Sequence, residues 1–247
     1  MSEATKHAKT PADQLETAKS QAIVVLGMHR SGTSALCGSL KGAGLYLGQV
    51  LDHSIRSNPK GLQEAPSLLY MHEDLLRTNG GSWDNPPHKP VWGKLHASVR
   101  DLFIESRKDQ SLWGFKDPRT LFALHGWLEV CPDLQAAGIF RHPAAVAKSL
   151  QQRNGFSIAK GLHIWTAYNQ KLLEWTDVLD LPIIEFSPVE AVMRPRLDAI
   201  ISKIGLGARD ADSFYDPAIP TSEAHNQMTL PEETRDTYHA LRARALA

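Results

Sequence analysis

The sequence has few of the features that mark extracellular, membrane-spanning or nucleic-acid-coating proteins. Only two of the 247 residues are cysteine, and neither lies in a CxxC or Cys/His cluster, so we expect no disulfide framework and no structural zinc site. No run approaches the roughly 20 apolar residues that cross a bilayer. The 27 basic and 27 acidic side chains cancel, whereas proteins that coat nucleic acid are usually basic. Any anion site must therefore be local, and we expect no nucleic-acid partner.

The first residues, MSEATKHAKTPADQLETAKSQ, are polar and contain no apolar core, so they do not resemble a secretory signal. Together with the scarcity of cysteine, this predicts a soluble, cytoplasmic protein. A chain of 247 residues suits one sizeable domain. We expect residues 1–20 to form a mobile tail, residues 21–207 to form that domain, and residues 208–247 to form an arm and a short helix packed on it.

Short apolar runs alternate with segments of helical periodicity along the expected domain. Strands are predicted at 22–27, 112–116, 136–141 and 181–186. Helices are predicted at 33–43, from Pro66 onward, and at 98–107, 121–130, 143–153, 159–179 and 189–204. Strands that alternate with helices form parallel sheets covered on both faces. We therefore predict a P-loop-like, three-layer α/β/α fold with a central parallel sheet in a single domain.

Residues 22–38, AIVVLGMHRSGTSALCG, join the first predicted strand to the first predicted helix through a loop between Gly27 and Gly32. Such a loop lies at the carboxyl edge of the sheet, where the unpaired N–H groups of the following helix bind anions. The glycine spacing is that of nucleotide triphosphatases, but Thr33 occupies the position of their lysine. Because that lysine reaches the β- and γ-phosphates, its absence argues against triphosphate chemistry and leaves a single phosphate as ligand. The candidate phosphate-binding residues are His29, Arg30, Ser31, Gly32, Thr33 and Ser34.

The sequence GMHRSGTSAL resembles the 5′-phosphosulfate-binding loop of the sulfotransferases that use 3′-phosphoadenosine 5′-phosphosulfate (PAPS), and most closely a bacterial branch with GMHRSGTS. The resemblance implies that Arg30, Gly32, Thr33 and Ser34 hold the 5′-phosphosulfate. It also implies that PAPS is the co-substrate and that 3′-phosphoadenosine 5′-phosphate (PAP) is the product. No metal ion is expected, since sulfuryl transfer requires no clamp on a γ-phosphate.

A second anion site is predicted in IFRHPAAVAKSL. In the family, an arginine at a strand end and a serine eight positions later hold the 3′-phosphate, which is the spacing of Arg141 and Ser149. The position is physically suitable, because Arg141 ends an apolar strand and Ser149 lies about 9 Å along the helix that starts at Pro143. Two anion sites on adjacent strand edges match a nucleotide phosphorylated at both ends of its ribose.

Sulfuryl transfer requires a base for the acceptor hydroxyl, cations for the sulfonate, and a site that excludes water. Glu64, in NPKGLQEAPSLL, precedes the helix marked by Pro66. Its segment resembles one in the bacterial branch and in tyrosylprotein sulfotransferases whose glutamate is thought to be the base. Lys116, in WGFKDPRT, closes a predicted buried strand, and the resemblance places its ammonium near the transferred sulfonate. The expected catalytic residues are therefore Glu64, Lys116 and Arg30.

Three histidines remain alternative bases: His72, two turns along the helix that follows Glu64, and also His29 and His53. Asp117 and Arg119 are expected to form structural pairs. The stretch WDNPP, residues 83–87, is a candidate lining of the acceptor cleft.

The sequence thus predicts a sulfotransferase that moves a sulfuryl group from PAPS to a hydroxyl or amine of a small-molecule, sugar or peptide acceptor. One alternative is a P-loop kinase or other phosphotransferase, and another is a non-catalytic nucleotide-binding module. The chain departs from the family near its C-terminus. PAPS enzymes often place a basic loop there, whereas SFYDPAIPTSEAHN offers His225 but no lysine or arginine.

Overall fold

The structure, a computed structural model, describes residues 20–53, 61–207 and 228–247. Helices and strands alternate along these residues, as the hydrophobic pattern predicts. In chain order the elements are β1 (Gln21–Leu26), α1 (Thr33–Gly42), α2 (Pro66–Thr78), α3 (Lys94–Glu105), β2 (Leu112–Lys116), α4 (Thr120–Leu128), β3 (Gln135–Phe140), α5 (Pro143–Asn154), α6 (Ile158–Val178), β4 (Ile183–Glu185), α7 (Glu190–Lys203) and α8 (Glu232–Arg244).

The four strands form one parallel sheet in the order β2-β1-β3-β4. Near the end of β1, Val25 is in register with Lys116 of β2 and with Ala137 of β3. Because the strands run in the same direction, their carboxyl ends lie at one edge of the sheet, where α/β folds bind ligands. That edge carries the loop after β1, the end of β2 and the residue that follows β3.

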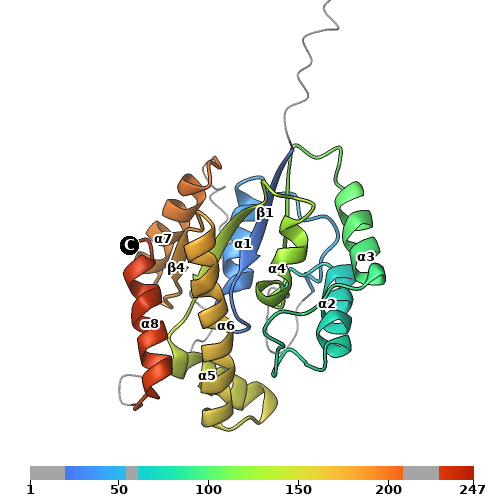
Figure 1. The fold of residues 1–247 in the computed structure, drawn as a ribbon. Coiled ribbons are helices and arrows are strands. Elements are labelled where there is room, and N and C mark those ends of the chain that lie inside the picture. Colours follow the sequence, from blue (N-terminus) through green and yellow to red (C-terminus); the bar gives the residue numbers. More distant parts are fainter. Residues whose placement is uncertain (1–19, 54–60, 208–227) are drawn as a thin grey trace, which may run out of the picture.

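Helices cover both faces of the sheet, with α1 behind it and α4 and α6 in front in the view of Figure 1. The side chains of β1 alternate between two cores: Ile23 and Val25 pack with α1 and α7, whereas Val24 and Leu26 face the core built from α4, α5, α6 and α8. Helices α2 and α3 extend this second layer beyond β2. The predicted three-layer α/β/α fold is confirmed.

Some predicted boundaries differ from the structure. Helix α3 begins at Lys94, earlier than predicted, and the Gly93 N–H at its start is satisfied by His96 Nδ1 at 3.1 Å. Strand β4 begins only at Ile183, after a proline that has no N–H to donate to a neighbouring strand.

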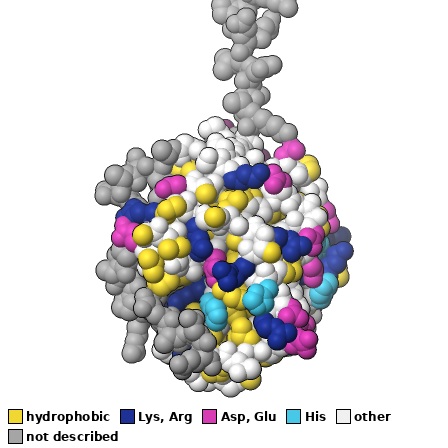
Figure 2. Space-filling model, turned by 90° about the vertical axis from the view of Figure 1, so that its left-hand side faces the viewer, with side chains coloured by type: hydrophobic (Ala, Val, Ile, Leu, Met, Phe, Trp, Pro, Cys, Tyr) yellow, Lys and Arg dark blue, Asp and Glu magenta, His cyan; other side chains and the backbone are white. Residues whose placement is uncertain are grey.

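Helix α8 packs against α6, and Leu246 beyond it pairs with Ile184 of β4. Residues 1–19 and 208–227, which include most of the expected tail and arm, lie outside the described residues. Within the part of the chain that is described, no helix combines the length and the apolar character needed to cross a membrane. Figure 2 shows the face that carries α7 and α8, where basic side chains are interspersed with acidic and apolar ones.

The turn out of β1 brings Gly27 against the neighbouring strand. Its φ is 152°, and a Cβ added there would lie 2.3 Å from the carbonyl oxygen of Ile139 in β3. Because that oxygen belongs to a strand backbone, it has little freedom to move away. The close approach of these two backbones therefore sets where the loop after β1 leaves the sheet.

Replacing Gly27 should disturb this turn. We expect Gly27→Ala to lower the free energy of unfolding by about 1–3 kcal/mol, because the strand backbone leaves no room for the methyl group. Gly42→Ala is the matched control, since a Cβ there meets nothing within 4 Å and alanine favours the helix. Urea unfolding measures both variants. Equal stabilities of the two would contradict the close approach.

Candidate functional site

The loop between β1 and α1 presents the N-terminus of α1 to the ligand edge of the sheet. Gly32 adopts a left-handed conformation with φ 91° and precedes the helix, and its carbonyl oxygen accepts the Leu36 N–H at 3.1 Å. The N–H groups of residues 33–35 therefore lie in the first turn, where no intrahelical acceptor exists. The first turn contains no acidic residue, so α1 itself does not neutralise the positive end of its dipole.

Position 32 also requires glycine because there is no room for a side chain. A Cβ added there would lie 2.4 Å from the ring of Phe186, which follows β4.

Within the loop, the Ser31 hydroxyl is buried and has no hydrogen-bond partner among the described residues. A buried donor without a partner is costly unless a ligand or water satisfies it. The loop therefore has a donor available for an anion.

The two predicted anion sites are in direct contact. Arg30 Nε donates to Ser149 Oγ at 2.8 Å, and Arg141 Nη1 donates to the Arg30 carbonyl oxygen at 3.4 Å. The backbone of Arg141 is held by the indole N–H of Trp165, which donates to its carbonyl oxygen at 2.9 Å. The sequence predicts two anion sites on adjacent strand edges, and the structure brings their residues together, since the side chain of Arg30 reaches Ser149.

This cluster brings two guanidiniums close together. The guanidinium of Arg141 lies 5.1 Å from the centre of the Phe186 ring, and it forms no ion pair with any carboxylate of the described residues. Burial, and then the charge of Arg30, lower the pKa of Arg141 to about 10. Burial and the charge of Arg153 likewise lower the pKa of Arg30. Because these neighbours disfavour the charged forms, an anion bound between them would be strongly stabilised.

Strand β2 ends in a buried ion pair. Lys116 Nζ lies 2.6 Å from Glu64 Oε1, and the two side chains are only 3% and 4% exposed. The same ammonium donates to the Leu62 carbonyl oxygen at 3.0 Å, which also accepts the Ser34 hydroxyl of α1 at 3.1 Å. The Leu62 carbonyl thus ties the segment that carries Glu64 to the first turn of α1. Two of the three predicted catalytic residues, Glu64 and Lys116, therefore lie together, beside the phosphate loop.

The carboxyl of Glu64 is more basic than an ordinary glutamate. Burial raises its pKa, while the ammonium of Lys116 acts in the opposite direction. A buried carboxylate that keeps a cation beside it has the properties required of a general base near neutral pH.

His72 is poorly suited to the role of base. The indole N–H of Trp127 donates to His72 Nε2 at 3.2 Å, so that lone pair is occupied and the network assigns the proton to Nδ1. Nδ1 faces Asp117 Oδ2 at 3.5 Å, and neither side chain is exposed. His72 is therefore a fully buried core residue that faces Asp117, out of reach of an acceptor.

The other two histidines lie in different surroundings. His53 is exposed. His29 is half-buried in the phosphate loop, with its ring edge-on to Trp83 at 5.0 Å and to Tyr168 at 5.8 Å. Burial, and then the charge of Arg119, lower the pKa of His29 well below its usual value, so this imidazole is neutral at pH 7.

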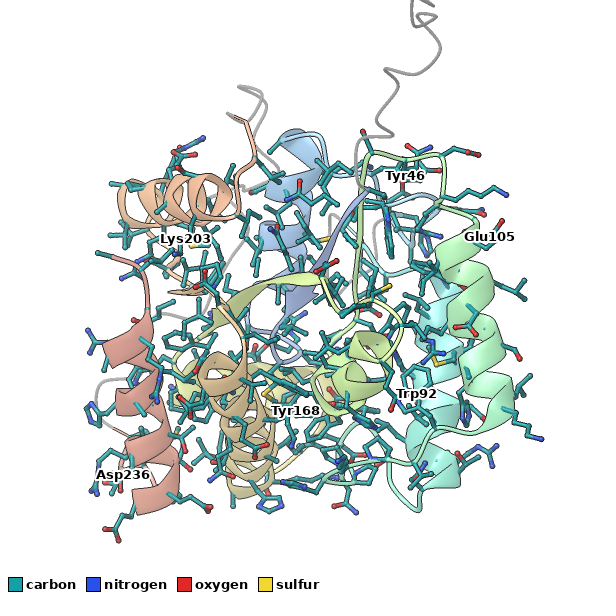
Figure 3. The ribbon with its side chains drawn as sticks, turned by 45° about the horizontal axis from the view of Figure 1, so that its top comes forward. Tyr46, Trp92, Glu105, Tyr168, Lys203 and Asp236 are labelled. Atoms are coloured by element: carbon teal, nitrogen blue, oxygen red, sulfur yellow. The ribbon has the colours of Figure 1, made fainter. Side chains whose placement is uncertain are left out.

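The WDNPP segment, residues 83–87, contacts the loop after β1, where its Trp83 ring meets the His29 ring. The Tyr168 hydroxyl donates to the Trp83 carbonyl oxygen at 2.8 Å, and the Trp83 ring stacks on Phe156 at 5.8 Å. An ion pair joins Asp84 to Lys160 of α6. Figure 3 shows Tyr168 between α6 and α4. The segment expected to line the acceptor cleft is thus fastened to α6 and contacts His29.

Two arginines near the site were not among the predicted site residues. Arg119, expected only as a structural partner of Asp117, also approaches Glu64, with Nη1 4.0 Å from Oε2. Arg153 follows Ser149 by one helical turn on the same face of α5, and its charge acts on Arg30. The sequence signal that could have identified Arg153 is its position four residues after Ser149, which places both residues on one face of the predicted helix.

Among the described residues there is no group of His, Cys, Asp and Glu that could hold a metal ion.

Comparison with solved structures finds sulfotransferase domains. The sulfotransferase domain from the Synechococcus PCC 7002 olefin synthase aligns with a TM-score of 0.55 at 18% sequence identity, over 98% of this chain and 100% of that domain. The sulfotransferase domain from the curacin biosynthetic pathway aligns with a TM-score of 0.50 at 16% identity, over 92% and 99% of the two chains. The chain has the fold of these sulfotransferase domains. No protein-family model matches the sequence, and no curated protein is significantly similar to it.

Removing one partner of the buried ion pair should destabilise this sulfotransferase fold. Lys116→Met leaves the Glu64 carboxylate buried without its cation, and we expect the free energy of unfolding at pH 7 to fall by about 3–5 kcal/mol. Without the ammonium that lowers it, the pKa of Glu64 rises further above its unfolded value. The folded state then binds the proton more tightly than the unfolded state, so the loss grows between about pH 5 and pH 8. Urea unfolding at several pH values across this range measures the loss in the free energy of unfolding.

The double variant Glu64→Gln/Lys116→Met is the control, because it removes both charges together. It should recover much of the lost stability and show little dependence on pH over the same range. A single variant as stable as the wild type would contradict the buried pair, and so would a loss that is independent of pH.

Proposed function

We propose that the protein is a sulfotransferase that moves a sulfuryl group from PAPS to a hydroxyl or amine acceptor. The observation that carries the proposal is the contact between the phosphate loop and the Arg141–Ser149 segment. It combines the dipole of α1 and two guanidiniums in one anion-binding cluster. The fold shared with sulfotransferase domains supports the same reading. One nucleotide with phosphates at both its 5′ and 3′ positions suits this arrangement.

The residues of the cluster fit such a donor. The N–H groups at the start of α1 and the unpartnered Ser31 hydroxyl suit the 5′-phosphosulfate. Arg141, with no carboxylate beside it among the described residues, and Ser149 suit the 3′-phosphate. Ser149 can serve this role while it accepts the Arg30 Nε–H, because a hydroxyl that accepts one hydrogen bond still has its own O–H to donate. Arg30 thus lies beside both phosphate-binding segments, and the sulfonate is the group that the sequence analysis expected it to hold.

Glu64 is the proposed base. As the acceptor oxygen bonds to sulfur, the bond between sulfur and the 5′-phosphate oxygen breaks, and the acceptor proton passes to Glu64. Protonation of Glu64 removes the negative partner of Lys116. The ammonium can then stabilise the charge that develops on the transferred group and the leaving oxygen. In this proposal the Lys116–Glu64 ion pair corresponds to the state before transfer, in which the base is ionised and the cation is held in place.

The donor assignment is tested by thermal stabilisation. PAP should raise the melting temperature more than adenosine 5′-monophosphate or ATP with magnesium, because it engages both parts of the cluster. In Arg141→Ala the affinity for PAP should fall about 10- to 100-fold, toward that for adenosine 5′-monophosphate, which lacks the 3′-phosphate. A magnesium-dependent response to ATP without a response to PAP would favour a kinase. An unchanged affinity of the Arg141 variant for PAP would contradict the second anion site.

The role of Glu64 is tested by transfer from radiolabelled PAPS to a panel of simple acceptors: a phenol, a hexose and a tyrosine-containing peptide. Glu64→Gln should reduce transfer at least about 100-fold, since the amide accepts no proton, while stabilisation by PAP persists. Glu105→Gln, on the exposed surface of α3, is the control and should transfer like the wild type. Transfer by Glu64→Gln near the wild-type rate would assign the base elsewhere, with His29 the next residue to test.

A further inference from the structure

Arg119 lies between β2 and α4, and its guanidinium faces three carboxylates. Its Nη1 is 3.0 Å from Asp117 Oδ1, its Nη2 is 2.7 Å from Glu73 Oε1, and Nη1 is also 4.0 Å from Glu64 Oε2. The side chain is 6% exposed. A planar guanidinium with several fixed donors can hold such an arrangement, whereas a lysine ammonium cannot hold the same geometry.

The core fixes the position of Arg119. Asp117 accepts both the backbone N–H of Arg119 at 2.8 Å and its guanidinium, and its second oxygen faces His72. His72 is in turn held by the indole N–H of Trp127. Although burial alone would raise it, the pKa of Asp117 is held below its ordinary value by Arg119 and His72, so Asp117 is an anion at neutral pH. This chain of contacts runs from the buried indole to the guanidinium beside Glu64.

The two oxygens of Glu64 have different surroundings. Oε1 accepts the ammonium of Lys116, whereas Oε2 accepts no hydrogen bond from the described residues and faces Arg119. Oε2 is therefore the oxygen free to receive a proton. We propose that Arg119 is a positioning residue, which fixes the orientation of the Glu64 carboxylate through Oε2 and holds it in its ionised form between two cations. The inference rests on the proposed function, in which Glu64 is the base.

Several other groups act on this carboxyl, and a test must separate them from Arg119. Lys116 of β2 stabilises the ionised form and Asp117 destabilises it. Cys37 of α1 and Tyr168 of α6 also lie within electrostatic range, and burial raises the pKa of both, so they are neutral at pH 7. Loss of the Arg119 cation should therefore raise the pKa of Glu64, so that the carboxyl holds its proton to higher pH.

The decisive measurement is the titration midpoint of the Glu64 carboxyl, followed by carbon-13 NMR of protein labelled at its glutamate side chains. The resonance is assigned by its loss in Glu64→Gln. In Arg119→Gln the midpoint should rise by about one pH unit or more, and the acidic limb of kcat should move upward with it. Arg119→Lys, which keeps the charge, should restore most of the midpoint shift. Arg77→Gln, the same substitution at a site that is 74% exposed, should leave the midpoint unchanged.

Arg119→Gln leaves Asp117 buried without its main partner and can fail to fold. The comparison of Asp117→Asn with Asp117→Asn/Arg119→Gln then isolates the same effect without an unpaired buried charge, and the double variant should have the higher midpoint. An unchanged midpoint in these comparisons overturns the inference, whether or not the protein transfers sulfuryl groups. A raised midpoint in a protein whose wild type transfers nothing contradicts the proposed function instead, and leaves the coupling of Arg119 to Glu64 in place.

Discussion

The parallel alignment of β2, β1 and β3 is the constraint on which the site depends. Three neighbouring strands end at the same edge of the sheet, and each brings a different part: Lys116 from β2, the phosphate loop from β1 and Arg141 after β3. No single segment forms the cluster. The register within the sheet sets how far apart these parts lie, and the close approach of Gly27 to Ile139 sets the direction in which the loop leaves. The hydrophobic cores on the two faces, by holding the strands together, thereby also position the charges.

The charges at this edge form two sets with different roles. Lys116 and Arg119 have carboxylate partners and belong to a buried network that includes the proposed base. Arg141 has no such partner among the described residues, and its lowered pKa reflects burial and a second guanidinium nearby. The first set holds a base in a defined ionisation state, whereas Arg141, together with Arg30, suits an anionic ligand. In the proposed function, this division separates donor binding from proton transfer.

Much of this organisation could be predicted from the sequence, because it depends on local patterns. Apolar runs bounded by glycine predict the strands, and the glycine spacing at 27 and 32 identifies the loop. Contacts between distant segments could not be predicted in the same way. Nothing local to Arg30 or Ser149 indicates that the two side chains meet, and the sequence left His72 as a possible base because the Trp127 contact that occupies its nitrogen depends on packing. Arg119 was assigned a structural role only, since its approach to Glu64 depends on the loop geometry after β2.

The most direct test of this account is an experimental structure of the protein with PAP bound. The account predicts one PAP molecule, with its 5′-phosphate on the N–H groups at the start of α1 and its 3′-phosphate between Arg141 and Ser149. It also predicts that the Ser149 hydroxyl, which accepts the Arg30 Nε–H at 2.8 Å, donates its own hydrogen to the 3′-phosphate. PAP bound at another surface, or bound with its 3′-phosphate in solvent, would contradict the claim that this cluster holds both ends of one nucleotide.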